Sequence, residues 1–163
     1  EYRAEEMAPG IFAKYSQFQV GARSFPNAML FSGGWFVKLG TQIEVPDELY
    51  DHDARNIETN PYAAQMAHVF EIAGIEYGRA DFGIVGGRVE VFEVNYNPNL
   101  TTQREKPRDN LLQRANRARV DDITFEAMHT IDSHGGRSAP TIWNDELNQF
   151  RLRWWRNYAP QRY

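Results

Sequence analysis

Short stretches that mix apolar and polar residues dominate the first quarter of the chain. Residues 11–20, IFAKYSQFQV, combine aromatic and β-branched residues, and residues 24–31 have the same character beyond the turn sequence VGAR at 20–23. Such runs are typical of β-strands, so we expect a hairpin here. EYRAEEMA at 1–8 predicts another strand, and WFVKLG at 35–40 predicts a further strand or extended segment.

The segment 61–73 has the pattern of an amphipathic helix. Asn60 and Pro61 have the form of an N-cap followed by proline at the first helical position. Apolar residues then recur at helical spacing up to Gly74. They are Tyr62, Met66, Val69, Phe70 and Ala73. We expect Met66, Val69 and Phe70 to pack on the apolar face of a hairpin that follows.

The order of these elements predicts an α+β fold. Two strands are expected on either side of Gly86 and Gly87, and helical patterns lie near 109–118 and 144–158. Hairpins followed by helices favour an antiparallel sheet with packed helices over a doubly wound sheet. No repeat or clear linker interrupts residues 1–163, so we expect one domain, in which residues 101–163 form a C-terminal helical extension.

Composition narrows the classes of function. The 163 residues are 42% hydrophobic and 25% charged, as in an ordinary globular domain. The net charge of −4 argues against a broad nucleic-acid surface, and no apolar run is long enough to predict a membrane span. The absence of cysteine excludes disulfides and thiolate metal sites. We expect a cytoplasmic protein without nucleic-acid or membrane partners.

The hairpin RADFGIVGGRVEVFEVNYNP at 79–98 places two acids around a double glycine. A two-residue turn would point Asp81 and Glu93 to opposite faces, whereas a three-residue turn with a glycine bulge would set them directly across from each other. The apolar pattern favours the second register. In that register Ala80, Phe82 and Ile84 share a face with Phe92 and Val94.

The other face of this hairpin then carries Arg79, Asp81, Glu93 and Asn95. Two opposed carboxylates repel each other unless something compensates their charge. A cation does so, and oxygen ligands without His or Cys suit Mg²⁺. The alternative is that Arg79 neutralises Asp81 while Glu93 is solvated at a sheet edge. Both interpretations stay open on spacing alone.

The residues also resemble a known family. GIEYGRADFGIVGGRVEVFEVNYNP at 74–98 resembles the metal-binding hairpin of ATP-grasp enzymes, with Arg-x-Asp on one strand and Glu-x-Asn followed by Pro on the next. FAKYSQFQVGARSFPNAMLFSGGWFVK at 12–38 is similar to the strand, turn, strand and Trp-x-x-Lys of a group of bacterial ATP-grasp proteins. The resemblance covers residues 1–100. It implies the C-terminal part of an ATP-grasp domain, a fragment whose N-terminal lobe would precede Glu1.

This resemblance implies roles for the hairpin residues. Asp81 would bind one Mg²⁺, Glu93 would bridge two ions, and Asn95 would bind the second, with Mn²⁺ as the alternative metal. Arg79 would be the catalytic residue that stabilises the transferred phosphoryl group. The implied activity is that of an ATP- and Mg-dependent ligase, which activates a small-molecule or peptide carboxylate as an acyl phosphate for attack by an amine.

Weaker candidates lie outside the hairpin, and of these Lys14 is suggested only by its place beside a strand. Glu5 and Glu6 lie in a stretch similar to the hinge strand that lines adenine and ribose, although solvated acids on an edge strand would look alike. Lys14 and Lys38 are candidates for contacting the ATP phosphates, although lysines at strand ends are commonly only solvated.

Other functions remain open. One is a non-catalytic nucleotide-binding or interaction module, and another is a phosphotransferase with a non-carboxylate acceptor. If a lobe precedes Glu1, the chain offers half a cleft, and we expect weak ATP binding, little ligation and self-association through apolar surface beside the first strand.

Overall fold

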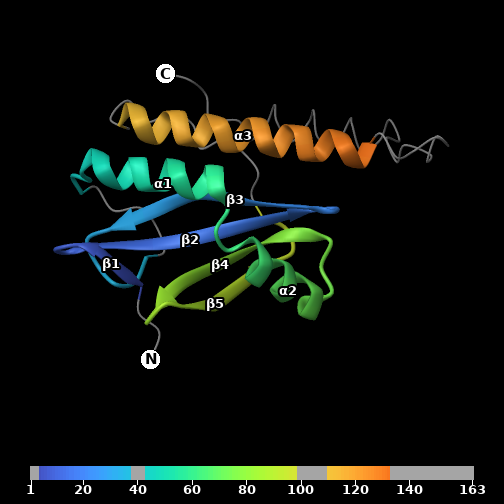
Figure 1. The fold of residues 1–163 in the computed structure, drawn as a ribbon, viewed down its shortest axis with the longest axis horizontal. Coiled ribbons are helices and arrows are strands. Elements are labelled where there is room, and N and C mark those ends of the chain that lie inside the picture. The colour runs from blue at the N-terminus through green and yellow to red at the C-terminus, as the bar shows by residue number, and fades with distance from the viewer. Residues whose placement is uncertain (1–3, 38–42, 99–109, 133–163) are drawn as a thin grey trace, which may run out of the picture. The chain divides into compact units, whose positions relative to one another are not determined.

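The computed structural model of the 163-residue chain describes residues 4–37, 43–98 and 110–132. Its elements, in chain order, are β1 (Glu5–Ala8), β2 (Ile11–Val20), β3 (Arg23–Ser32), α1 (Asp47–Thr59), α2 (Ala63–Ala73), β4 (Tyr77–Val85), β5 (Arg88–Asn95) and α3 (Leu111–Asp132). A curled antiparallel sheet carries the three helices (Figure 1). The fold is therefore α+β, as predicted.

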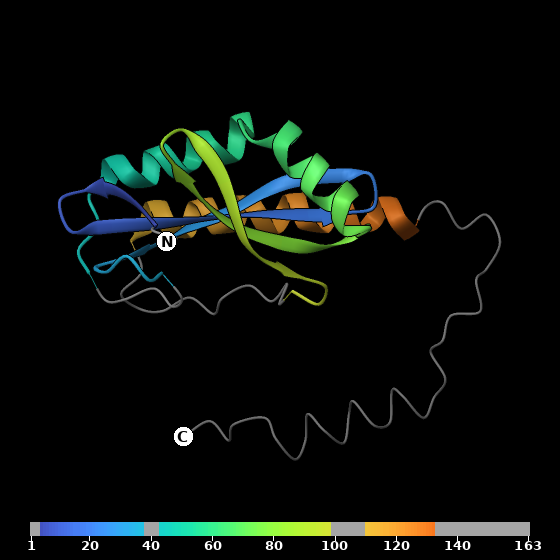
Figure 2. The same ribbon diagram turned by 90° about the horizontal axis from the view of Figure 1, so that it is seen from below.

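Strand β2 is the centre of the sheet because it pairs along both of its edges (Figure 1, Figure 2). β3 runs along one edge, while β1 and β4 pair with the first and second parts of the other edge. β5 pairs with β4. The predicted hairpins are confirmed. Residues 35–37 belong to no strand, and the rest of the segment predicted at 35–40 lies outside the described residues.

The helical predictions have different outcomes. α2 confirms the helix predicted at 61–73, and the pattern near 109–118 forms the first part of α3. Asn60 adopts a left-handed conformation with φ 45° and caps the C-terminal end of α1. Its interpretation as the N-cap of α2 is therefore wrong. The helix predicted at 144–158 lies outside the described residues, and the single domain with an extension at 101–163 stays a prediction.

Two apolar clusters form the core of the part of the chain that the structure describes. The first joins the sheet to α1 and α2 and contains Ala13, Tyr15, Met29, Phe31, Tyr50, Met66, Phe70, Ile75, Ala80 and Phe82. The second joins the turn end of the β2–β3 hairpin to α1 and α3 and contains Phe18, Val20, Phe25, Ala28, Ile57, Val120 and Ala127. Along β2, side chains that alternate in direction thus reach both clusters.

The predicted contact between α2 and the later hairpin is confirmed in part. Met66 and Phe70 lie in the first cluster together with Phe82, as their helical spacing indicated. Phe92 was expected on the same apolar face, but its side chain is 39% exposed. That part of the prediction is wrong, because the strand pairing shifts beside Phe92, as described below.

A buried carboxylate, Asp53, connects α1 to β3 and to α3. Asp53 of α1 is 1% exposed, and its Oδ1 accepts a hydrogen bond from the backbone N–H of Met29 at 2.9 Å. Asn116 of α3 donates its amide to Asp53 Oδ2 at 3.0 Å and to the carbonyl of Tyr50 at 2.8 Å. The Met29 N–H lies where the β2–β3 pairing shifts register. The side chain of Asp53 thus satisfies a backbone donor at an irregularity of the sheet.

This carboxylate makes stability depend on pH. Burial raises the pKa of Asp53 from 3.8 to about 6, although the hydrogen bonds from Met29 and Asn116 oppose the shift. The folded state therefore keeps a proton between pH 4 and 6 that the unfolded state releases, so this group makes the protein less stable as pH rises through that window. At about 1.4 kcal/mol per pH unit, the effect is on the order of 3 kcal/mol.

Asp53→Asn should remove that dependence. The variant loses the hydrogen bond from Asn116, because an amide N–H₂ cannot accept one, but it no longer titrates. We expect urea unfolding at a series of pH values to show a smaller fall in unfolding free energy between pH 4 and 6 than in the wild type. Equal falls in the two proteins would contradict a buried, titrating Asp53.

Candidate functional site

The candidate site is built on the β4–β5 hairpin. Asp81 lies directly across from Glu93, and Arg79 lies across from Asn95. The prediction that these side chains share one face of the hairpin is therefore confirmed. The two residue pairs combine two acids, one cation and one amide, and they are separated in the ladder by the pair of Ala80 and Val94, which faces the other side.

The predicted pairing of Asp81 with Glu93 is produced by a bulge within β5 and not by the length of the turn. Gly86 and Gly87 form a two-residue turn with φ angles of 56° and 79°, as a type I′ turn requires, so the expected three-residue turn is wrong. The pairing shifts by one residue between Asp81 and Phe82, and Phe92 is the extra residue on β5. This bulge turns Phe92 out of the core register.

Asp81 is a buried carboxylate held between two cations. It is 1% exposed. Lys14 Nζ of β2 lies 2.7 Å from Asp81 Oδ2. Arg79 Nε lies 2.8 Å from Oδ1, and Arg79 Nη2 lies 3.3 Å from Oδ2. Ser16, also buried, pairs with Asp81 in the ladder between β2 and β4. The negative charge is thus compensated from two strands, and Lys14 joins the predicted cluster.

Glu93 and Asn95 form the more open part of the cluster. Glu93 is exposed, and Asn95 is half-buried. The side-chain oxygen of Asn95 accepts a hydrogen bond from the backbone N–H of Asn97 at 2.9 Å, which fixes the start of the loop after β5. Carboxylate and amide oxygens on one face suit a hard divalent cation.

A metal here would need further ligands. Within residues 4–37, 43–98 and 110–132, no three His, Cys, Asp or Glu side chains lie close enough to hold a metal ion. Asp81 and Glu93 supply two carboxylates, and Asn95 supplies a neutral oxygen. Mg²⁺ commonly takes one or two protein carboxylates and completes its shell with water and phosphate oxygens, so the residues present fit that mode.

The remaining candidates lie elsewhere. Glu5 Oε2 accepts a hydrogen bond from the Tyr15 hydroxyl at 3.0 Å, on the sheet face opposite to Lys14. Burial, and next the charge of Glu5, raise the pKa of that hydroxyl. Glu6 Oε1 accepts the backbone N–H of Gly10 at 2.9 Å within the β1–β2 turn. Both acids thus have contacts of structural type, and Lys38 lies outside the described residues.

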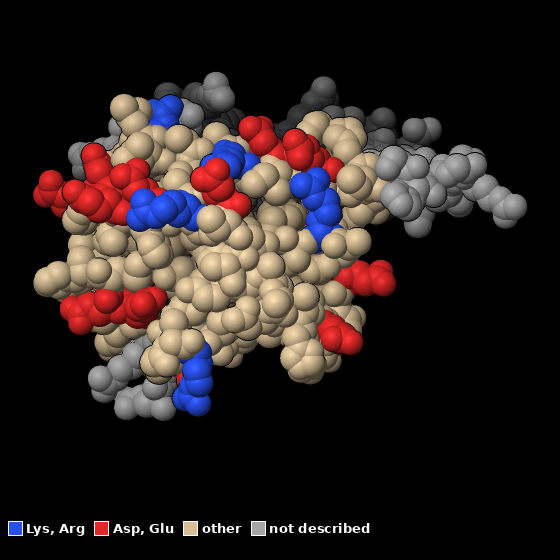
Figure 3. Space-filling model, viewed as in Figure 1, with Lys and Arg blue, Asp and Glu red and all other residues tan. Residues whose placement is uncertain are grey.

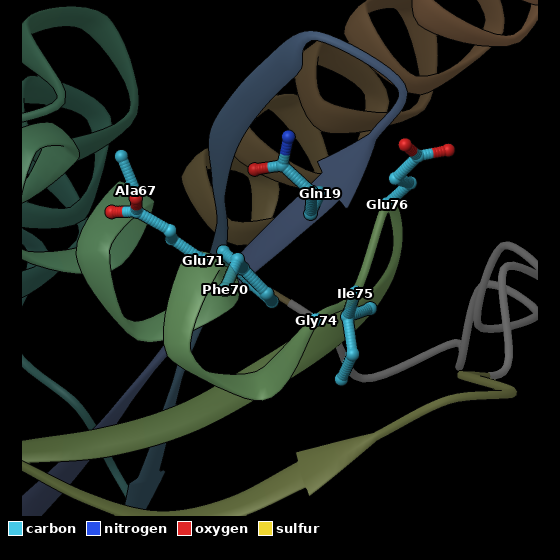
Figure 4. Close-up of a pocket in the computed structure, with 7 residues that line it drawn as sticks. All are labelled: Gln19, Ala67, Phe70, Glu71, Gly74, Ile75 and Glu76. Carbon is cyan, nitrogen blue, oxygen red and sulfur yellow. The ribbon is translucent and has the colours of Figure 1, made fainter.

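A pocket of about 370 Å³ lies beside the C-terminal end of α2, away from the cluster (Figure 4). It is lined by Gln19, Ala67, Phe70, Glu71, Gly74, Ile75 and Glu76. Gln19 alternates with Lys14 and Ser16 along β2, so the pocket opens on the other face of the sheet. None of the predicted site residues lines it.

Neither comparison with known proteins nor the distribution of surface charge identifies a ligand for this site. No protein-family model, no curated protein and no solved structure matches the chain. On the face shown in Figure 3, acidic and basic side chains of the described residues are interspersed, without an extended basic area. Among those residues, no helix is both long and apolar enough to cross a bilayer.

Gly78 allows the close approach that places Asn95. A Cβ at Gly78 would lie 2.8 Å from the carbonyl oxygen of Asn95 and 3.1 Å from Ile75 Cγ2. We expect Gly78→Ala to cost about 1–3 kcal/mol, because the neighbouring backbone must shift. Gly34→Ala is the control, since a Cβ there meets nothing within 4 Å. Urea unfolding of both variants tests this, and equal stabilities would contradict it.

The pair of Lys14 and Asp81 should respond asymmetrically to mutation. Asp81→Asn leaves a buried ammonium without an anion, and breaking a buried pair in this way costs about 3–5 kcal/mol. Lys14→Met should cost less, because Asp81 keeps Arg79. Combining both changes should recover part of the loss.

Unfolding free energies of the two single variants and the double variant test this expectation. The exposed pair of Arg88 and Glu90, 3.7 Å apart on the same hairpin, is the control. Exposed pairs contribute about 0–1 kcal/mol, so its variants should hardly change stability. A larger loss for Lys14→Met than for Asp81→Asn would overturn the proposed asymmetry.

Proposed function

We propose that the chain is the C-terminal part of an ATP-grasp ligase that binds Mg·ATP at the β4–β5 hairpin. The observation that carries this proposal is the alignment of Asp81 with Glu93 and of Arg79 with Asn95 on one face. The motif that resembles the family thus has its polar side chains in positions from which they can act together. The substrate proposed is a small-molecule or peptide carboxylate.

Each side chain has a definite part in this proposal. Asp81, Glu93 and Asn95 would hold the divalent ions, which neutralise the charge that builds up on the phosphoryl group during transfer. The substrate carboxylate takes the terminal phosphoryl group to give an acyl phosphate and ADP, and an amine then displaces phosphate. Arg79 uses some of its guanidinium donors on Asp81 and keeps others for phosphoryl oxygens.

A second candidate function has an observation of its own. Both oxygens of Asp81 are already paired with Lys14 and Arg79. The alternative without a metal, in which Arg79 neutralises Asp81, requires the pair with Arg79. This favours a non-catalytic nucleotide-binding or interaction module, in which the cluster serves the fold. A phosphotransferase with another acceptor would use the same residues, since none of the described side chains defines the acceptor.

Glu93→Gln tests the proposal in the complete protein. We expect the variant to lose Mg-dependent ADP release with candidate acids and amines, because an amide cannot bridge two cations as a carboxylate does. The fold should remain intact, since Glu93 is exposed. Isothermal titration with Mg·ATP, together with the ADP assay, provides the measurement.

Glu71→Gln on α2 is the matched control, because it removes the same charge from an exposed glutamate on another element. It should bind and turn over Mg·ATP like the wild type. Unchanged turnover in Glu93→Gln would remove Glu93 from the mechanism. ATP binding without any dependence on metal would support the non-catalytic module instead.

A further inference from the structure

We propose that Lys14 is an internal counter-ion that makes metal binding at Asp81 depend on a phosphate-bearing ligand. The inference rests on the proposed function, in which Asp81 is a metal ligand. It adds a regulatory property of that site: the site would discriminate between a free divalent ion and an ion bound to a nucleotide.

The first step is competition for one carboxylate oxygen. Lys14 Nζ lies 2.7 Å from Asp81 Oδ2, and the two side chains are 8% and 2% exposed. Arg79 already takes Oδ1 at 2.8 Å. A divalent ion at Oδ2 would stand within a few ångströms of the ammonium, where two positive charges repel strongly in a poorly hydrated site. The metal and Lys14 therefore exclude each other.

The second step identifies which of the two cations, Lys14 or Arg79, a metal ion would displace from Asp81. Arg79 contacts both oxygens of Asp81 and stands two residues away on the same strand. Lys14 contacts Asp81 through one atom, from the neighbouring strand. An ammonium on a flexible four-carbon stem can leave a carboxylate more readily than a planar guanidinium that holds it with two donors. Lys14 is therefore the cation that a metal displaces.

The third step is the energy of displacement. A free metal ion would leave the Lys14 ammonium in a largely buried position without an anion, which is costly. A ligand that carries phosphate brings new anionic oxygens for the released ammonium. Metal and phosphate ligand should therefore bind with positive coupling, and thermodynamic linkage makes that coupling reciprocal.

The test measures Mn²⁺ affinity rather than turnover. The full chain is titrated with Mn²⁺, and the signal of the free ion in electron paramagnetic resonance gives the bound fraction, without and with a non-hydrolysable ATP analogue. Lys14→Met removes the competing charge, and Lys14→Gln is a second neutral variant in case the first does not fold. Lys14→Arg keeps the charge. Arg88→Met changes the net charge equally at an exposed position on β5.

We expect both neutral variants to bind free Mn²⁺ about tenfold more tightly than the wild type, a change of about 1.4 kcal/mol. Lys14→Arg should bind free Mn²⁺ no more tightly than the wild type, because a guanidinium leaves a carboxylate less readily than an ammonium does. Arg88→Met should stay within about twofold of the wild type, because its charge is exposed and screened. The gain in Mn²⁺ affinity caused by the ATP analogue should be about tenfold smaller in the neutral variants. A merely structural lysine would not alter that ratio.

Two results would overturn the inference in distinguishable ways. If the wild type binds Mn²⁺ with the ATP analogue, Glu93→Gln does not, and Lys14→Met binds free Mn²⁺ like the wild type, the counter-ion role is wrong while the proposed function stands. If Glu93→Gln binds Mn²⁺ like the wild type under every condition, the metal site is wrong. The role of Lys14 then falls with it.

Discussion

One extra residue, Phe92, decides which side chains of the β4–β5 hairpin share a face. Val89 and Val91 are two positions apart, but Val94 comes three positions later, and all three pack against the first apolar cluster. A regular strand cannot direct all three to one side, because side chains alternate. The bulge resolves this conflict, and the same shift brings Glu93 to the face of Asp81. The polar site therefore depends on the requirements of the core.

Among the residues that the structure describes, two carboxylates, Asp53 and Asp81, are buried, and they are stabilised in different ways. Asp53 accepts neutral hydrogen bonds from a backbone N–H and from Asn116, and burial raises its pKa to about 6. Asp81 lies between Lys14 and Arg79, so its charge is compensated by cations. The hydrogen bonds to Asp53 join α1 to β3 and α3, and the charge of Arg117 also opposes the rise in the pKa of Asp53. Both oxygens of Asp81 are paired, so a metal ion there would have to displace one of the two cations.

The sequence determines local structure further than it determines long-range pairing. The strands and α2 follow from alternation and helical spacing, which are local. α1 escaped prediction because its buried face includes Asp53 and Asn56, which count as polar in any hydrophobic pattern. The contact between Lys14 and Asp81 spans 67 positions and depends on the register of β2 with β4. The hairpin half of the site was therefore predictable, whereas its cation from β2 was not.

One face of β2 is apolar in the second part of the strand and charged at Lys14. This difference supports the proposed role of Lys14, Asp81 and Arg79 in binding. Phe18 and Val20 are covered by apolar side chains of α3, whereas Lys14, on the same face, is buried against Asp81. Replacing a buried ion pair with apolar residues of similar volume is often neutral or stabilising. A chain under selection for stability alone would therefore be expected to continue the apolar pattern to Lys14. Charged residues at this position are what the proposed binding site would require of the Lys14–Asp81–Arg79 cluster.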